Sequence, residues 1–227
     1  MASLVLLFLS FAGASGSPDL WKARDLQDRP VLLRLATESS TAAEAHASEP
    51  DLLYRAALAQ STLAEVAMEA RDKTQAKAAA ESGMKAADKA VALKSSMAEY
   101  HRILGTLCGQ AAAATGGLAA LKYGRCALDE VNKAVEMDPK SSLNHLSHGV
   151  GNYYLPQALG GGLDLAIHDF EKAITLDAHN ADAELWLGIA LRKANRNAEA
   201  HKAFERAVQL NPARVWAKQQ LDKSPAQ

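Results

Sequence analysis

Three of the seven histidines have the spacing that comes nearest to metal chemistry. His145 and His148 form an H-x-x-H pair, and His101 precedes His145 by 44 residues. Two imidazoles three residues apart share one face of a helix, where they can bind a metal ion. No glutamate follows as in the H-E-x-x-H motif, and no third ligand is set by spacing. We therefore expect hydrogen-bonded histidines packed between helices, and no metal site.

The two cysteines, Cys108 and Cys126, are predicted to lie on two facing helices. In an exported protein such a pair can form a disulfide, whereas helical proteins also keep free buried cysteines as small apolar filler. A disulfide requires the two Cα atoms to lie within about 7 Å of each other. The sequence does not fix that distance, so both interpretations stay open.

A third candidate is the glycine run Gly160, Gly161 and Gly162. A phosphate-binding loop needs a preceding strand and a Gly-Lys-Ser/Thr ending, and neither is present here. The run is therefore interpreted as a hinge. No nucleophile–base pair and no paired-carboxylate signature stands out elsewhere, so the sequence predicts no catalytic residue and no cofactor, and hence no enzyme.

Composition favours a chain made only of helices. The 227 residues carry a formal net charge of −1, and only 5% of them are aromatic, whereas alanine is abundant. Small residues with high helix propensity suit closely packed helices better than sheets. The near balance of charge gives no global field that would attract nucleic acid or an anionic membrane, so neither is expected as a partner.

The N-terminus resembles a secretory signal peptide. Residues 4–14 are apolar and end in an Ala12-x-Ala14 cleavage pattern, although no positive charge precedes them. A run this short cannot cross a membrane, which takes about 20 residues. We expect residues 1–16 to be a signal peptide, residues 17–29 to be a linker, and the mature chain to be periplasmic or secreted without a transmembrane span. The alternative is a buried N-terminal helix or a truncated start, in a cytoplasmic protein.

The elements that would position any site are repeated helical hairpins. In residues 181–214, Gly188, Ala200, Ala207 and Pro212 are separated by 12, 7 and 5 residues. Two antiparallel helices approach closely only where side chains are small, so Gly188 and Ala200 are expected to mark their contact. This spacing resembles the tetratricopeptide repeat, a helix–turn–helix of about 34 residues.

Imperfect copies of this unit fill the rest of the chain. The closing alanine recurs with periods of 45, 44, 39 and 34 residues, and Ser141 and Asn180 are placed to cap the first helices of the last two units. The sequence thus predicts an all-α, right-handed solenoid over residues 30–223, more closed than a regular array because its early units are longer. Its predicted units are a partial one at 30–50, then 51–97, 98–141, 142–180 and 181–214, with a capping helix at 212–223.

The irregular units carry a second resemblance, over about residues 51–221. The Lys122-Tyr123-Gly124 segment, the Glu-x-Asp-Pro step that ends at Pro139 and the Gly160–Gly162 run are similar to the regulator-of-microtubule-dynamics family. They are also similar to bacterial repeat proteins such as the T component of TRAP transporters. The resemblance implies a binding role, toward partner proteins or, in some members, lipids or small ligands.

The predicted binding site is the concave wall, which the first helix of each unit lines in such solenoids. Counting along the repeats predicts a groove that is apolar in the middle, with arginines at its sides and polar residues at its rim. The predicted lining residues are Arg102, Leu143, Leu146, Val150, Asn152, Tyr153, Leu185, Ile189 and Arg192. The alternative is that the N-terminal half covers these residues as ordinary core.

Two hypotheses follow from this groove. The first is a non-catalytic scaffold that binds a protein or peptide partner, and the second is a carrier of a lipid or small hydrophobic ligand in a closed cavity. Some tetratricopeptide repeat proteins clamp a C-terminal carboxylate with Lys and Asn at the positions held here by Leu146, Val150, Leu185 and Ile189. Docking of that kind is therefore not expected.

Overall fold

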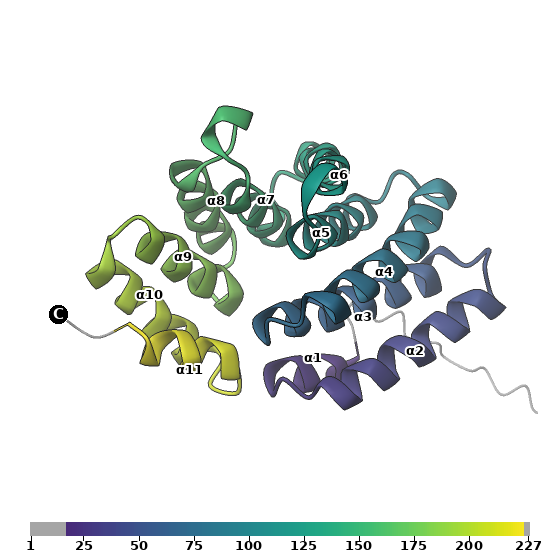
Figure 1. Cartoon of the computed structure of the whole chain (residues 1–227), viewed down its shortest axis with the longest axis horizontal. Coiled ribbons are helices and arrows are strands. Elements are labelled where there is room, and N and C mark those ends of the chain that lie inside the picture. The colour runs from purple at the N-terminus through teal and green to yellow at the C-terminus, as the bar shows by residue number, and fades with distance from the viewer. Residues whose placement is uncertain (1–16, 225–227) are drawn as a thin grey trace, which may run out of the picture.

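The computed structural model describes residues 17–224, so the predicted signal peptide at residues 1–16 lies outside the described residues. Within the described range, all regular secondary structure is helical (Figure 1), which confirms the all-α prediction. The elements are α1 Pro18–Asp25, α2 Arg29–Ala45, α3 Pro50–Glu69, α4 Lys73–Leu93, α5 Ala98–Ala114, α6 Gly117–Met137, α7 Ser142–Tyr154, the short 3-10 helix η1 Gln157–Leu159, α8 Leu163–Leu176, α9 Ala181–Lys193, α10 Asn197–Leu210 and α11 Val215–Asp222.

Successive helices pack as hairpins into a curved solenoid. The pairs α1/α2, α3/α4, α5/α6, α7/α8 and α9/α10 follow one another around an arc, and α11 packs on the last pair. Ser141 and Asn180 cap α7 and α9 as predicted, because their side chains accept hydrogen bonds from the backbone N–H of Asn144 at 3.2 Å and of Ala183 at 3.0 Å. The helical-repeat solenoid is thereby confirmed.

The segment expected to be a linker, residues 17–29, instead contains helix α1. The Ser17 hydroxyl accepts a hydrogen bond of 3.3 Å from the backbone N–H of Leu20, and Pro18 occupies the first turn, where its missing donor costs nothing. Leu20 and Ala23, three residues apart, are buried against the N-terminal core. The leading unit is therefore a complete hairpin, and the expectation of a half unit was wrong.

Glycine lets the two helices of a hairpin approach closely. A Cβ atom built on Gly188 would lie 2.5 Å from Phe204 Cε1, and one built on Gly149 would lie 2.6 Å from Phe170 Cε1. Both distances are far inside van der Waals contact, so no side chain fits at either position. The side chain that packs on each of these glycines is thus a phenylalanine ring of the second helix, whereas the sequence pattern suggested an alanine such as Ala200.

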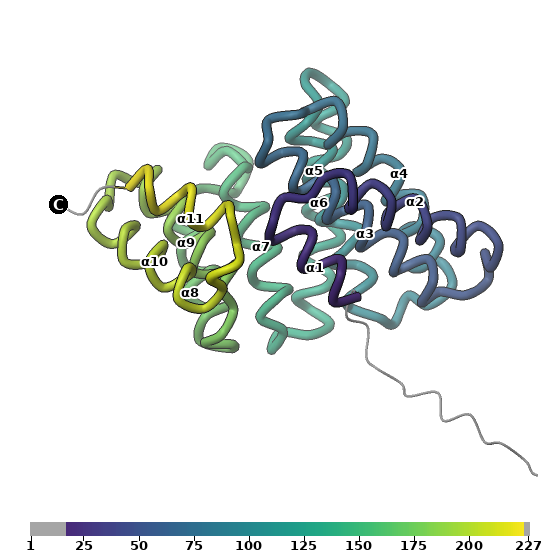
Figure 2. The backbone as a smooth tube through the Cα atoms, turned by 90° about the horizontal axis from the view of Figure 1, so that it is seen from below, coloured from purple at the N-terminus to yellow at the C-terminus, as the bar shows by residue number. Residues whose placement is uncertain are grey.

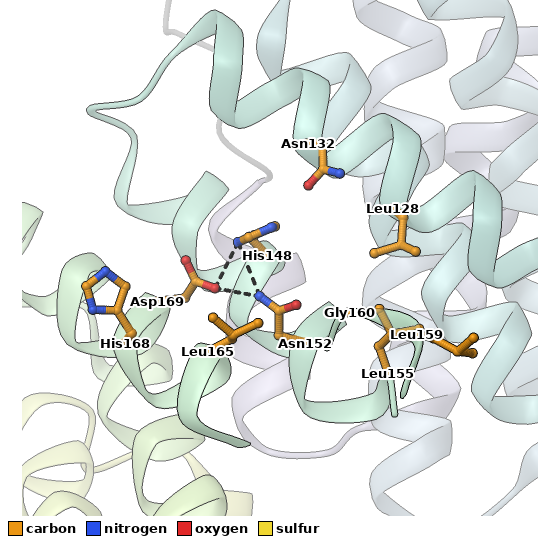
Figure 3. Close-up of a pocket in the computed structure, with 10 residues that line it drawn as sticks. All are labelled: Leu128, Asn132, His148, Asn152, Leu155, Leu159, Gly160, Leu165, His168 and Asp169. Atoms are coloured by element: carbon orange, nitrogen blue, oxygen red, sulfur yellow. Dashed lines mark hydrogen bonds and ion pairs between the residues drawn. The ribbon is translucent and has the colours of Figure 1, made fainter. Parts of the chain in front are cut away.

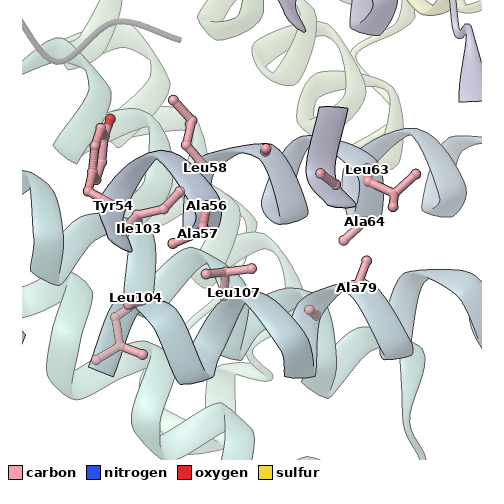
Figure 4. Packing of buried hydrophobic residues seen from close by; sticks show 14 of the residues in the cluster. Tyr54, Ala56, Ala57, Leu58, Leu63, Ala64, Ala79, Ile103, Leu104 and Leu107 are labelled. Atoms are coloured by element: carbon pink, nitrogen blue, oxygen red, sulfur yellow. The ribbon is translucent and has the colours of Figure 1, made fainter. Parts of the chain in front are cut away.

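Buried apolar side chains form two separate cores. One lies in α1 to α5 (Figure 4), and the other draws on α8 to α11. Hydrogen bonds cross the junction between them: Asn144 Nδ2 donates to Ala134 O at 2.8 Å, and Arg102 Nη1 donates to Ser147 Oγ at 3.4 Å. The junction of α5 and α6 with α7 therefore joins two apolar units, and hydrogen bonds are among its contacts.

Cys108 and Cys126 form a disulfide, which decides between the two alternatives left open by the sequence. Their Cα atoms lie 5.9 Å apart, and the bond ties α5 to α6. Cys108 is completely buried. The disulfide therefore stabilises the α5/α6 hairpin, which forms the N-terminal side of the junction.

Candidate functional site

The residues predicted to line the concave wall fall into several environments. Leu185 and Ile189 are only 1% and 8% exposed and belong to the C-terminal core. Leu146 and Val150 are half-buried on α7 and pack against the same core, whereas Leu143 at the start of α7 is exposed. The apolar middle of the predicted groove is thus partly buried in the C-terminal core.

The two arginines expected at the sides of the groove are both engaged within the chain. Arg102 Nε donates to Glu99 Oε2 at 2.7 Å, and Glu99 Oε1 accepts from the Tyr54 hydroxyl at 2.6 Å. Burial raises the pKa of Glu99, but Arg102 and these hydrogen bonds outweigh it and hold the pKa below its usual value. Arg192 Nη2 donates to Gln220 Oε1 at 2.5 Å and thereby links α9 to α11.

A row of aromatic rings runs across three successive first helices, α7, α9 and α11. Tyr153 lies 5.7 Å from Trp186 between ring centroids, and Trp186 lies 5.5 Å from Trp216, both edge to face. Tyr154, which is 52% exposed, also contacts Trp186 at 6.2 Å. Tyr153 was predicted to line the groove, whereas neither tryptophan was, although tryptophan is rare enough in this chain to mark a site. We call Tyr153, Tyr154, Trp186 and Trp216 the aromatic row.

The two ends of the solenoid meet through charged side chains. Arg24 Nη1 of α1 donates to Asp182 Oδ2 of α9 at 2.6 Å. Arg214, just before α11 and 1% exposed, donates through Nη2 to Glu65 Oε1 of α3 at 2.7 Å and also hydrogen-bonds Glu69. We call this network of Arg24, Asp25, Glu65, Glu69, Asp182 and Arg214 the end contact.

Further bonds support the end contact, as Asn211 Nδ2 donates to Asp25 Oδ2 at 2.9 Å and Gln219 Nε2 donates to Gln27 Oε1 at 3.2 Å. Figure 2 shows α1 and α11 on the same side of the molecule. Burial, together with repulsion from Glu65, raises the pKa of Glu69 to about 7 even though Arg214 donates to its carboxylate. The contact thus encloses two guanidinium groups among four carboxyl groups.

A cavity of about 350 Å³ lies among α6, α7, η1 and α8 (Figure 3). One side is apolar and the other carries a polar cluster centred on Asp169. The lining residues are Leu128, Asn132, His148, Asn152, Leu155, Leu159, Gly160, Leu165, His168 and Asp169.

The polar cluster accounts for the H-x-x-H pair. Asp169 Oδ2 accepts hydrogen bonds of 2.8 Å from His148 Nδ1 and from Asn152 Nδ2, and Asp169 Oδ1 lies 3.6 Å from His145 Nδ1. His101 is held elsewhere, with its Nδ1 2.6 Å from Glu130 Oε2. In residues 17–224, no group of three or more His, Cys, Asp or Glu side chains is arranged to hold a metal ion. Asn152 thus belongs to this cluster rather than to a groove rim.

Comparison with known proteins places the chain in a family. The family model described as regulator of microtubule dynamics protein 1-3 matches residues 21–157, and a tetratricopeptide repeat model matches residues 161–221. The search of curated proteins found no match. None of the helices from residue 17 to residue 224 is both long and apolar enough to span a membrane.

A solved tetratricopeptide repeat protein shares the fold. TTC0263 from Thermus thermophilus is 17% identical with a TM-score of 0.62, and the match covers 89% of this chain and 98% of that one. YrrB, a protein with an unusual peptide-binding site, is 19% identical with a TM-score of 0.45, covering 91% and 98%. MamA from Desulfovibrio magneticus RS-1 is 16% identical with a TM-score of 0.48, covering 88% and 99%. The chain therefore belongs to the regulator of microtubule dynamics family and is built from tetratricopeptide repeats.

Proposed function

We propose that the chain is a non-catalytic scaffold that binds a protein or peptide partner through the first helices of its C-terminal half. The observation that carries the proposal is the aromatic row on α7, α9 and α11. These rings are half-buried or exposed, and Leu146 and Val150 continue the same apolar surface along α7. Tyrosine and tryptophan supply much of the binding energy in protein interfaces because they offer a large contact area at a low cost in side-chain entropy.

The spacing of these side chains favours a partner segment with regularly placed anchors. Leu146, Val150 and Tyr153 follow one another at intervals of four and three residues, so they share one face of α7. Trp186 and Trp216 extend that face across the neighbouring helices. A helix or an extended segment that inserts apolar side chains between these residues would bury them from water.

A charge placed within this surface tests the proposal. Val150→Glu should abolish partner capture, because a carboxylate desolvated at the centre of an apolar interface costs several kcal/mol, on the order of the whole binding energy of a transient complex. Leu33→Glu on α2, where Leu33 is 50% exposed, introduces the same charge far from the surface and serves as the control. Both variants should retain the circular dichroism spectrum of the unmodified protein.

The readout is quantitative affinity purification of the tagged protein from its source. The proposal predicts that the unmodified protein and Leu33→Glu recover the same partner and that Val150→Glu does not. Equal recovery by all three would refute the assigned surface. Native mass spectrometry of the same samples distinguishes the scaffold from the carrier, because the carrier hypothesis predicts that a lipid copurifies and that no partner protein does.

We also propose that the chain is exported. The apolar run at residues 4–14 supports this, as does the disulfide between Cys108 and Cys126, because disulfides persist mainly in oxidising compartments. Mass spectrometry of the intact protein from its source would test the proposal. Export predicts a mature N-terminus that lies after Ala14 and no later than about Ser17. A chain that begins at Met1 or Ala2 would contradict it.

A further inference from the structure

We propose that the cavity among α6, α7, η1 and α8 binds a primary alkylammonium group, with Asn152, His148 and Asp169 holding the ammonium and leucine side chains holding the alkyl chain. This cavity is separate from the aromatic row. It gives the protein a second binding site, whose ligand follows from the orientation of the polar cluster.

Asp169 fixes the orientation of the Asn152 amide. A carboxylate can only accept hydrogen bonds, so the Asn152 atom that lies 2.8 Å from Asp169 Oδ2 must be the NH₂ nitrogen. The carbonyl oxygen Oδ1 of Asn152 is then left for the cavity, which this residue lines. Asn152 is only 5% exposed, and no partner of its Oδ1 occurs among the described residues. This carbonyl oxygen is therefore available to accept a hydrogen bond from a ligand in the cavity.

Asp169 also fixes the tautomer of His148. At 2.8 Å from Asp169 Oδ2, His148 Nδ1 must carry the proton, since two acceptors would repel each other at that distance. The 3.4 Å approach of the Asn152 amide nitrogen to the same ring nitrogen is then not a hydrogen bond, because both atoms are donors. In the neutral ring the opposite nitrogen, Nε2, is an acceptor, and no described residue hydrogen-bonds to it. The cavity therefore presents two acceptors held by one carboxylate.

The carboxylate itself favours a cationic donor over a neutral one. Asp169 is 7% exposed, and among residues 17–224 the basic side chains with a nitrogen within 4 Å of its carboxylate are His145 and His148, with no Lys or Arg nitrogen there. His145 Nε2 lies 3.0 Å from the carbonyl oxygen of Pro139, and its Nδ1 is buried without a hydrogen bond. An ammonium group at Asn152 and His148 would offset the buried negative charge behind them.

The other wall of the cavity suits an alkyl chain. Leu128 of α6, Leu155 just before η1 and Leu159 at its end line this wall, whereas Leu165 of α8 lies beside Asp169 (Figure 3). Leu159 and Leu165 are 58% and 48% exposed, so burying them against a ligand removes apolar surface from water. An amine with a short alkyl chain can therefore contact the leucines while its ammonium reaches Asn152. Such a group is found both in free alkylamines and in the lysine side chain of a protein.

The test is a ¹H–¹⁵N NMR titration of the full chain at pH 8 with three probes of equal chain length: n-hexylamine, n-hexanol and sodium hexanoate. The proposal predicts saturable shifts at the Asn152 side-chain amide, with n-hexylamine binding at least about tenfold more tightly than n-hexanol, since hydrogen bonds to charged groups contribute roughly twice as much as neutral ones. Sodium hexanoate should bind weakest. Equal binding of the three probes, or no shift at Asn152, would overturn the assignment.

Two variants test separately where the ammonium group and the alkyl chain of the ligand bind. Asp169→Asn should weaken n-hexylamine binding about tenfold and leave n-hexanol nearly unchanged, whereas Leu159→Ala should weaken both probes alike. Asp164→Asn removes an exposed carboxylate from the same helix and serves as the matched control, with binding unchanged. An n-hexylamine affinity that is the same in Asp169→Asn as in the unmodified chain would contradict the proposal. Should Asp169→Asn fail to fold, the ranking of the three probes alone decides.

A fourth probe identifies the source of the ammonium. Nα-acetyl-lysine N-methylamide presents the same group on a peptide backbone. If it binds more tightly than n-hexylamine, the site recognises a lysine side chain of a partner, and if it binds less tightly, the site recognises a free alkylamine. Either ranking supports the ammonium assignment, and binding of neither probe refutes it. Because Val150 does not line the cavity, this test stands apart from that of the proposed function.

Discussion

Arg24 and Asp182 lie 158 residues apart in the sequence, and Arg24 Nη1 donates a 2.6 Å hydrogen bond to Asp182 Oδ2. The bond joins the first helix of the solenoid to α9, near its other end. Arg214 lies beside this pair, with its Nε 3.7 Å from Asp182 Oδ1. An open superhelix would leave these side chains in water. The end contact therefore closes the arc of helices into a ring.

Arg214 is expected to be the most costly residue of the end contact to replace. Arg214→Met would leave Glu69, whose side chain is 2% exposed, without its cationic partner. Removing one member of a buried ion pair costs about 3–5 kcal/mol. Urea unfolding would measure this loss. Arg196→Met, which breaks an exposed pair with Glu199, should have little effect on the unfolding free energy, and an equal cost for the two variants would show that Arg214 is not buried in solution.

The pKa of Glu69 predicts how stability depends on pH. A carboxyl group whose pKa rises from 4.5 to about 7 on folding binds a proton more tightly in the folded state, so this group's contribution falls as pH rises from about 4.5 to 7 and is constant above. The change is on the order of 3 kcal/mol. The side chain in Glu69→Gln cannot ionise, so the unfolding free energy of this variant should not show that decrease between about pH 4.5 and 7. Parallel pH profiles for the variant and the unmodified protein would contradict the shift.

Glycine-to-alanine substitutions test how closely the helices of a hairpin pack. Gly188→Ala places a methyl group 2.5 Å from the Phe204 ring and should destabilise the fold by roughly 1–3 kcal/mol. Gly124→Ala lies in the helix α6 with nothing within 4 Å of the new Cβ, and it should stabilise by about 0.5–1 kcal/mol through helix propensity. Thermal unfolding of both variants gives the comparison. A gain in stability for Gly188→Ala would mean that the helices lie farther apart than the structure shows.

The disulfide is expected to stabilise the chain by about 3 kcal/mol, because it closes a loop with a sequence separation of 18 residues. Reductant should lower the unfolding free energy of the unmodified protein by that amount. The double variant Cys108→Ala/Cys126→Ala should be less stable from the outset and insensitive to reductant. A reductant effect of the same size on the variant would assign the change to something other than this bond.

The repeat architecture was predictable because hairpin packing constrains local sequence. Gly188, Ala200 and Pro212 lie within one unit, so their spacing is visible without knowing any long-range contact. Helix α1 was predictable in principle from Ser17 and Pro18, but its charged residues suggested a solvated linker. Arg24 and Asp25 are charged because they meet the other end of the chain.

The candidate sites were less predictable because they depend on how tightly the solenoid curves. The repeat positions of Leu185 and Ile189 predict side chains that line an open groove, whereas here both side chains are buried in the C-terminal core. The same limit applies to the cavity. His145 and His148 were visible as a pair, but Asp169, which orients His148, lies on the next helix, and no periodicity connects the two.

A double-mutant cycle between Arg24→Ala and Asp182→Ala tests most directly whether contact between its ends closes the solenoid. Unfolding free energies of the unmodified protein, both single variants and the double variant give the coupling energy between the two side chains. A closed ring predicts a coupling of about 1 kcal/mol or more, in keeping with a partly buried ion pair. Additive effects, within about 0.3 kcal/mol, would show that the two ends do not meet.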